Sequence, residues 1–349
     1  MVKVLAWPAF KNKASNPYNY LLYKGIEKEG VDVQEFSFKR LFLMRYDIVH
    51  IHWPELYLNS HYLSKAILYN VMLLLGLLLG KCFNKKTVWT VHNLKPHKIK
   101  YLRLNKLFWR CYLPLVDSVI SLSKSNEKLF FEKFSFKKKL NSAVVYHGLY
   151  EGYYENNISK DDAKKHFAID PSSKVCLFIG QVKAYKNVEA LVDIFNQNKL
   201  KDTVLIIAGK FESPEYYNKV KVLANNNSNI IIHNKFIFDN ELQHYFNAAD
   251  LCVLPFKDIF NSGSVLLSAS FNTPVLVPYS DNFMEYAELI GENFITTYSE
   301  DINETLIVKQ LKTTCKPLKN NESKLLWCEV QKELSCYYKS LVNSKSEIK

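Results

Sequence analysis

The lysines in residues 178–187, FIGQVKAYKN, are the first candidates for binding chemistry. An apolar strand ends at Gly180, and Lys183 and Lys186 follow it just before a helical pattern that Asn187 is expected to cap. Backbone amides at a helix start, with an ammonium group nearby, suit a phosphate. The segment is not a Walker loop, because it lacks Gly-x-x-x-x-Gly-Lys. An ordinary strand-to-helix turn with surface lysines is the alternative interpretation.

The segment NSGSVLLSASFNTPVLVP, residues 261–278, contains no acid, base or thiol. Ser262 or Ser264 is expected to cap a helix that runs from Val265, and Gly263 allows the backbone to approach a ligand closely. Successive amides at this helix start predict a second anion site. Two such sites in one domain suit a diphosphate, whereas a plain helix cap explains the serines but not the lysine loop.

Histidines end two of the predicted strands in the first half of the chain. His92 follows an apolar strand in TVHNLKPH, where it could orient a sugar hydroxyl or share a proton near neutral pH. His50 and His52 lie two residues apart in DIVHIHWPE, hence on one face of a strand, with Glu55 just beyond. No third ligand pattern accompanies them, so a packed histidine pair beside Trp53 is predicted, and no metal.

Two further segments carry candidate contacts. After the first strand, Asn16 is expected to cap a helix, Pro17 to take its first position, and Tyr18 to face a polar loop that could contact an acceptor. His147, in AVVYHG, lies at the junction of the two halves and is a candidate donor contact. A structural turn is an equally good interpretation of His147.

Short apolar strands alternate with helical patterns along the chain and place these residues. The strands are expected at residues 2–7, 31–38, 47–53, 87–93, 118–123 and 143–148, and again from 174 onward. Among the helical patterns are residues 16–30, 62–80 and 101–115. This alternation predicts an α/β fold of two Rossmann-like, doubly wound domains that face a central cleft.

The domains are expected at residues 1–155 and 156–321, with a linker near 149–172. Residues 322–349 are expected to form a helix that packs back on the first domain. In open parallel sheets, ligands bind beyond the carboxyl ends of the strands, where all the candidate loops lie.

Composition narrows the class of protein. The 349 residues, 48% of them hydrophobic, are enough for two cores, and the net charge of +12 favours anionic partners. Seven cysteines without a Cys-x-x-Cys pair, and an N-terminus without a secretion signal, predict a cytoplasmic protein. The apolar segment 66–80 is shorter than the roughly 20 residues of a membrane span. It predicts a buried crossover helix, with a face that dips into a bilayer as the alternative.

Taken in order, these segments resemble glycosyltransferases of the GT-B architecture, in particular the family-4-like group and related bacterial polysaccharide enzymes. The resemblance runs through DIVHIHWPE, TVHNLKPH, VVYHG, FIGQVKAYKN, LIIAGK, NAADLCVLPF and residues 261–278 to Glu285. It implies that the second domain binds a nucleotide-sugar donor and the first domain an acceptor. It also implies a reaction that needs no metal and no cofactor besides the donor substrate.

The resemblance assigns roles to single residues. Lys186 matches a lysine that contacts the donor phosphates, and Lys183 replaces the charge of an arginine that the family has where this chain has Gln181. His92 matches a histidine that contacts the donor sugar. Glu285, in SDNFMEY, matches a glutamate after the last nucleotide loop.

The chain departs from the family around residues 261–278. Family-4 enzymes commonly carry two glutamates eight positions apart there; the second would fall near Ser268, and neither is present. Contacts to the donor sugar and ribose must therefore come from other residues or from backbone amides. The departure leaves both retention and inversion of the anomeric centre open, with His92, Glu55 or another acid as the base in the inverting case. Glu55, like Asn16 and Tyr18, is also a candidate contact to the acceptor.

The predicted function is hexosyl transfer from a nucleotide-diphosphate sugar to a glycan or lipid-linked acceptor in surface polysaccharide synthesis. The protein is expected in the cytoplasm, peripherally attached at the inner face of the membrane. A nucleotide-sugar 2-epimerase has the same two-domain architecture and needs no acceptor. A basic nucleic-acid-binding protein is the non-enzymatic alternative, but no basic stripe interleaved with aromatic residues is present.

Overall fold

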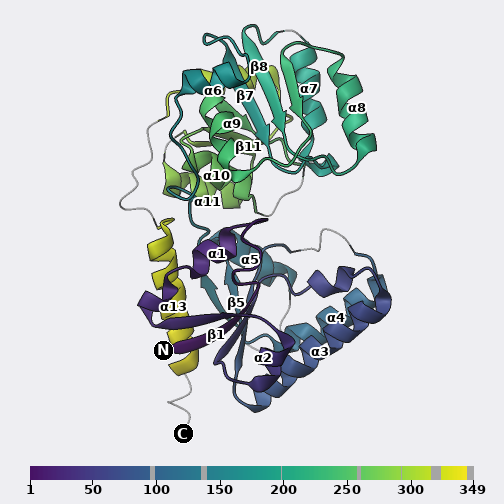
Figure 1. Ribbon diagram of the computed structural model, residues 1–349, viewed down its shortest axis with the longest axis vertical. Coiled ribbons are helices and arrows are strands. Elements are labelled where there is room, and N and C mark those ends of the chain that lie inside the picture. The colour runs from purple at the N-terminus through teal and green to yellow at the C-terminus, as the bar shows by residue number, and fades with distance from the viewer. Residues whose placement is uncertain are drawn as a thin grey trace. The chain divides into compact units, whose positions relative to one another are not determined.

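The computed structural model describes residues 1–94, 99–134, 140–197, 199–257, 261–291, 293–315 and 324–343. The chain forms two compact units: Met1–Gly148 with Lys324–Lys349, and Leu149–Ser323. Each unit holds a six-stranded parallel sheet with helices on its faces (Figure 1). The predicted α/β fold with two doubly wound domains is therefore confirmed, and the first unit ends at Gly148 rather than at residue 155.

The sheet of the first unit has the strand order β2-β1-β3-β4-β5-β6. Its strands are β1 (Val2–Trp7), β2 (Val31–Glu35), β3 (Ile48–Ile51), β4 (Lys86–Thr90), β5 (Ser118–Ser121) and β6 (Asn141–Val144). Its helices are α1 (Tyr18–Tyr23), η1 (Ile26–Glu29), α2 (Phe38–Leu43), η2 (Leu56–Asn59), α3 (Leu63–Cys82), α4 (Leu102–Tyr112), η3 (Leu113–Leu115), α5 (Lys124–Lys133) and α13 (Trp327–Asn343). The order reverses between β1 and β3, so the loops after these strands meet at one edge.

The helix expected at residues 16–30 is two shorter pieces, α1 and η1. Between them Gly25 has a φ of 91°, a conformation that ends the first helix and that glycine adopts without strain.

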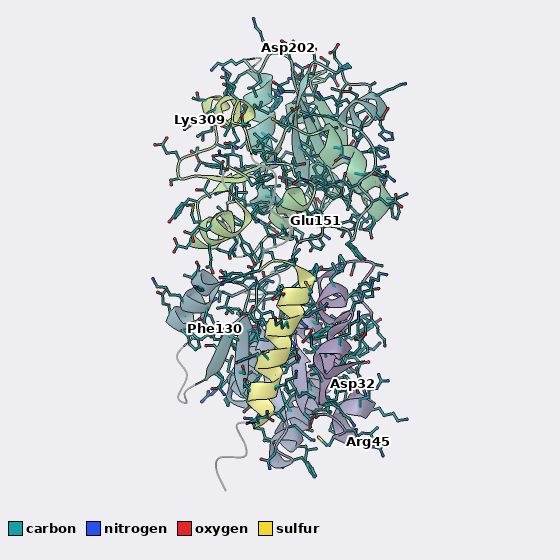
Figure 2. All side chains as sticks on the ribbon, turned by 90° about the vertical axis from the view of Figure 1, so that its left-hand side faces the viewer. Asp32, Arg45, Phe130, Glu151, Asp202 and Lys309 are labelled. Atoms are coloured by element: carbon teal, nitrogen blue, oxygen red, sulfur yellow. The ribbon has the colours of Figure 1, made fainter. Side chains whose placement is uncertain are left out.

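The C-terminal helix α13 belongs to the core of the first unit. Figure 2 shows α13 in yellow along this unit, where its residues Val330, Leu334, Tyr338 and Leu341 are buried against β1 and α1. A segment far along the sequence therefore completes the first hydrophobic core.

The sheet of the second unit has the strand order β12-β11-β10-β7-β8-β9. Its strands are β7 (Lys174–Ile179), β8 (Thr203–Ala208), β9 (Ile230–His233), β10 (Leu251–Val253), β11 (Val275–Pro278) and β12 (Ile295–Tyr298). Its helices are α6 (Lys160–His166), η4 (Ala184–Lys186), α7 (Val188–Asn196), α8 (Pro214–Ala224), η5 (Asp239–Glu241), α9 (Leu242–Ala248), α10 (Gly263–Ser270), α11 (Asp281–Ile290) and α12 (Glu304–Leu311). Helix α6 lies within the segment expected to be a linker.

Helix α3 connects β3 to β4 as predicted, but only one of its faces is buried. The buried face is Ala66, Asn70, Leu73, Gly76, Leu77 and Gly80. The opposite face is apolar and exposed: Leu63, Ile67, Leu68, Val71, Leu75, Leu78 and Leu79. Within the described ranges, α3 is the one helix long and apolar enough to cross a membrane. Overall hydrophobicity therefore misled the prediction: the buried face consists mostly of small residues and Asn70, whereas the exposed face consists of leucine-like residues.

Candidate functional site

The two phosphate-binding segments predicted from the sequence meet in the second unit. Its strand order reverses between β7 and β10, and these neighbouring strands lead into the lysine loop and toward α10, respectively. The amide of Lys257, after β10, donates to the carbonyl oxygen of Tyr185 at 2.8 Å and ties the two loops together. Residues 258–260 of the second loop lie outside the described residues.

Lys186 and Ser264 converge over the backbone of Gly180. A Cβ atom built on Gly180 would lie 3.3 Å from both Lys186 Nζ and Ser264 Oγ, and Gly180 has a φ of +126°. An ammonium and a hydroxyl from the two loops thus flank the backbone of Gly180. This arrangement suits an anion that is bound by both loops.

The ammonium of Lys186 lies over apolar rings, 5.5 Å from the centroid of Phe256 and 5.9 Å from that of Phe178. Burial and, to a smaller extent, the nearby charge of Lys183 lower the pKa of Lys186 to about 8. No carboxylate of the described residues forms an ion pair with Lys186. A bound diphosphate would supply the missing negative charge and raise this pKa.

The start of α10 differs from the prediction. The helix begins at Gly263, not at Val265, and the side chain of Ser262 makes no capping bond. Asn187 likewise precedes α7 with a positive φ of 56° and makes no side-chain cap. The first amides of α10 are therefore not satisfied by the serine cap that the sequence analysis expected.

Tyr150 is a residue near this site that the sequence analysis missed. A Cβ atom built on Gly263 would lie 3.5 Å from the Tyr150 hydroxyl, and the Tyr150 amide donates to Ser270 Oγ at 2.8 Å. The ring is buried. Nothing in the segment around Tyr150 signals this contact, which depends on tertiary packing.

The remaining predicted donor residues lie in the same unit, except His147. Lys183 is the residue before η4. Glu285 is partly buried in the second turn of α11, whose first turn is capped by Ser280 accepting from the Phe283 amide at 3.2 Å.

In the first unit, the loop after β1 is held by Glu35 at the end of β2. The carboxylate of Glu35 accepts hydrogen bonds from the amides of Ala9, Phe10 and Lys11, at 3.3, 2.7 and 2.9 Å. Further on, α1 begins at Tyr18 with Pro17 as its N-cap, one residue later than predicted, and Asn16 Oδ1 accepts from the Tyr18 amide at 3.1 Å. These hydrogen bonds fix the conformation of the loop at the carboxyl end of β1.

The predicted orientation of Tyr18 is wrong. Its ring does not face the loop but is buried, because it fills the centre of an aromatic cluster. Its centroid lies 4.6 Å from His147, 5.1 Å from His92 and 5.9 Å from His52. Tyr18, His92 and His147, which come from three separate motifs, are therefore brought together in one unit.

His50 and His52 form the predicted packed pair, with ring centroids 4.3 Å apart. Trp53 packs beside them and stacks on His92 at 4.4 Å. Among the residues that the structure describes, no group of three or more His, Cys, Asp or Glu side chains could hold a metal ion.

The histidine pair belongs to a buried hydrogen-bond chain. The Tyr23 hydroxyl lies 2.7 Å from both His50 Nδ1 and His52 Nε2, and His52 Nδ1 lies 3.0 Å from His92 Nε2. The Tyr338 hydroxyl, from α13, lies 2.5 Å from His50 Nδ1. This series of hydrogen bonds links α13 to His92.

Burial separates the candidate bases by their pKa. It lowers the pKa of His92 to about 3 and that of His147 to about 4, so both rings are neutral near pH 7. It raises the pKa of Glu55, beside η2, to about 7. A general base works best with a pKa near the working pH, so Glu55 suits this role better than His92.

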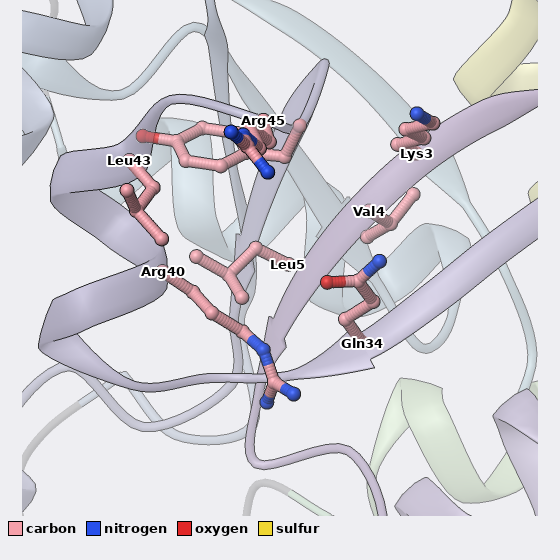
Figure 3. Close-up of a pocket in the computed structure, with 8 residues that line it drawn as sticks. Lys3, Val4, Leu5, Gln34, Arg40, Leu43 and Arg45 are labelled. Atoms are coloured by element: carbon pink, nitrogen blue, oxygen red, sulfur yellow. The ribbon is translucent and has the colours of Figure 1, made fainter.

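One cavity of about 290 Å³ lies elsewhere on the first unit, between β1, β2 and α2 (Figure 3). It is lined by Lys3, Val4, Leu5, Gln34, Arg40, Leu43, Arg45 and Tyr46. None of the candidate site residues lines it, so the cavity is not part of the site.

Comparisons with known proteins identify the class of enzyme. The family described as "Glycosyl transferases group 1" matches residues 159–306, which include the lysine loop and the start of α10. A GDP-mannose:glycolipid 4-beta-D-mannosyltransferase of Xanthomonas campestris pv. campestris is 25% identical over 300 residues, covering 85% of this chain and 79% of the relative. The chain is a GT-B glycosyltransferase.

Solved structures support the fold of this glycosyltransferase over its whole length. Anabaena HepE in complex with UDP and glucose matches with a TM-score of 0.65 and 13% identity, covering 99% of each chain. Sucrose-phosphate synthase from Thermosynechococcus elongatus matches with a TM-score of 0.62 and 12% identity, covering 100% of this chain and 98% of the other. No comparison favours the epimerase alternative.

Proposed function

We propose that this glycosyltransferase transfers mannose from GDP-mannose to a glycolipid acceptor in surface polysaccharide synthesis. The observation that carries the proposal is the meeting of Lys186, Ser264 and the start of α10 where the strand order reverses between β7 and β10. This place suits the diphosphate of a nucleotide sugar. The choice of donor and acceptor follows the names of the Xanthomonas relatives.

In this proposal the second unit holds the donor. Lys186 and Lys183 neutralise the diphosphate, and the amides of Ser262, Gly263 and Ser264 donate to its oxygens. Glu285 binds a hydroxyl of the ribose or of the sugar, and His147 of the first unit contacts the transferred sugar. No metal is required in this scheme, because lysines and helix amides offset the charge that develops on the leaving diphosphate.

The first unit holds the acceptor. The loop around Asn16 contacts it, and Tyr18 acts indirectly by packing the histidine cluster. Transfer from an α-linked nucleotide sugar to give a β-glycoside inverts the anomeric carbon. An acceptor oxygen then attacks that carbon, the bond to the diphosphate oxygen breaks, and the acceptor proton passes to Glu55. His92 donates or accepts one hydrogen bond at a sugar hydroxyl.

Release of nucleoside diphosphate tests this function. With a lipid-linked acceptor present, we expect GDP release from GDP-mannose to exceed release of UDP from UDP-glucose. Without acceptor, we expect only slow hydrolysis. Conversion of the donor to an epimer in the absence of acceptor would instead establish the epimerase, and a preference for UDP-glucose would reverse the donor assignment.

We also propose that the first unit binds the inner face of the membrane through α3 and α4. Helix α3 packs against α4, which exposes Leu102 and Leu107 together with Arg103, Lys106 and Arg110. Neither helix contains an aspartate or a glutamate. An apolar face bordered by positive charge is complementary to a bilayer of anionic lipids.

Vesicle co-sedimentation tests this membrane face. We expect binding to vesicles that contain phosphatidylglycerol and little binding to pure phosphatidylcholine. Leu75→Glu should weaken binding roughly ten- to hundredfold, since burying a leucine side chain contributes about 1.5–3 kcal/mol. Val222→Glu is the matched control, because Val222 is 77% exposed but lies on α8 of the second unit. Equal loss in both variants, or none in Leu75→Glu, would contradict the proposal.

A further inference from the structure

The hydrogen bonds that run from α13 to His92 admit an arrangement of their protons with a single direction. A neutral phenol has one proton, and a neutral imidazole has one N–H and one acceptor nitrogen. His50 and His92 are neutral near pH 7, because burial lowers the pKa of each to about 3, and burial also lowers the pKa of His52. Each ring in the chain therefore donates through one nitrogen and accepts through the other.

The first link is set at His50. Its Nε2 lies 2.6 Å from Thr90 Oγ1, and its Nδ1 faces both Tyr338, at 2.5 Å, and Tyr23, at 2.7 Å. One arrangement of the protons places that of Tyr338 on the Nδ1 lone pair, at the shorter of the two contacts. His50 then carries its proton on Nε2 and donates to Thr90.

The remaining links follow from this assignment. In this arrangement the lone pair of His50 Nδ1 is taken, and the proton of Tyr23 lies on the contact to His52 Nε2. His52 then carries its proton on Nδ1 and donates it to His92 Nε2. His92 is left with its own proton on Nδ1.

We propose that Tyr338 is a positioning residue that, through His50, Tyr23 and His52, selects the tautomer of His92 protonated on Nδ1. His92 then meets a substrate oxygen as a hydrogen-bond donor. Without the Tyr338 hydroxyl, Tyr23 can donate to His50 instead, and the whole chain can reverse so that His92 Nδ1 becomes an acceptor. This inference rests on the proposed role of His92 for its effect on transfer, but not for the tautomer itself.

The tautomer is measured directly in the resting enzyme by ¹⁵N NMR of histidine-labelled protein, with His92 assigned by comparison with His92→Gln. We expect a protonated Nδ1 and an unprotonated Nε2 in the wild type. In Tyr338→Phe we expect both signals to shift toward the averaged values of mixed tautomers. Unchanged His92 signals in Tyr338→Phe would overturn the proposal.

Tyr337→Phe is the matched control, because it removes a hydroxyl from the neighbouring position of α13. That hydroxyl bonds to Ser118, and no hydrogen bond joins it to a histidine of the described residues. Its His92 signals should match the wild type; an equal shift in both variants would mean that α13 acts by general packing. Thermal unfolding of both variants shows whether each remains folded.

Kinetics separate this inference from the proposed function. We expect Tyr338→Phe to lower kcat for transfer roughly tenfold, the value of one well-made hydrogen bond, with the donor KM unchanged. A shifted tautomer with unchanged kcat would remove the proposed role of His92 but leave the positioning chain in place. An unchanged His92 tautomer in Tyr338→Phe would disprove the proposed hydrogen-bond pathway, whatever the activity of the variant.

Discussion

Lys186→Ala should reduce kcat/KM for transfer by roughly two to three orders of magnitude, the usual cost of removing one group that stabilises a developing anion. The ammonium of Lys186 shares the space over Gly180 with Ser264 and has no carboxylate partner among the described residues. Its loss leaves the diphosphate with only helix amides and the more distant Lys183. Nucleotide release under initial-rate conditions measures the loss of kcat/KM, and calorimetric titration with GDP measures the loss of diphosphate binding.

The same lysine should give donor binding a dependence on pH. The pKa of Lys186 is lowered to about 8, and only its protonated form neutralises a phosphate. Affinity should therefore be constant below about pH 8 and fall by up to tenfold per pH unit above it. In Lys183→Ala the decline should begin at a higher pH, since the charge of Lys183 helps to lower the pKa of Lys186.

Lys221→Ala is the charge-matched control for this site. Lys221 is exposed on α8 of the same unit and belongs to neither loop. Donor affinity in this variant should equal that of the wild type. Unchanged affinity in Lys186→Ala would rule out the phosphate site, whereas equal losses in Lys186→Ala and Lys221→Ala would indicate only nonspecific charge attraction.

Glu55→Gln should lower kcat by roughly two to four orders of magnitude, because the acceptor proton then has no base. The amide has nearly the shape of the carboxylate, so binding of the donor should not change. In the wild type, kcat/KM should fall below about pH 7, where Glu55 becomes protonated. Above that pH the carboxylate is present and the rate should level off.

His92→Ala separates the two candidate bases. If Glu55 is the base, kcat of His92→Ala should be roughly tenfold lower than that of the wild type, the value of one hydrogen bond. Its kcat/KM should still fall below about pH 7. If His92 is the base, His92→Ala should carry the larger loss and Glu55→Gln should be nearly as active as the wild type. Glu27→Gln, an exposed glutamate on η1 of the same unit, controls for the loss of one charge.

Much of this site could be predicted from the sequence because it lies in loops that follow strongly patterned strands. Apolar β-branched runs fixed where β7 and β4 end, and hence that Lys186 and His92 lie at carboxyl edges. In the second unit, the reversal of strand order then brings the lysine loop and the start of α10 together. The residue types in these loops and the order of the strands therefore predicted the same anion site in the second unit.

Other features depended on contacts that no local pattern encodes. Tyr18, Tyr20 and Tyr23 lie in one short helix with aromatic rings on several sides, so the sequence could not say that Tyr18 is buried and Tyr20 only partly so. Tyr338 reaches His50 from 288 residues away. Its place in the hydrogen-bond chain follows only from the packing of α13 on the first sheet.

That packing has a consequence for biosynthesis. Val330, Leu334, Tyr338 and Leu341 of α13 are part of the core that surrounds β1 and β3. Domains usually fold in order as they leave the ribosome. Here the first domain cannot complete its core until the ribosome has translated residue 341. By then the whole second domain has already been synthesised. We expect the nascent enzyme to hold an unfinished amino-terminal half throughout translation, with its exposed leucines free to meet chaperones or the membrane first.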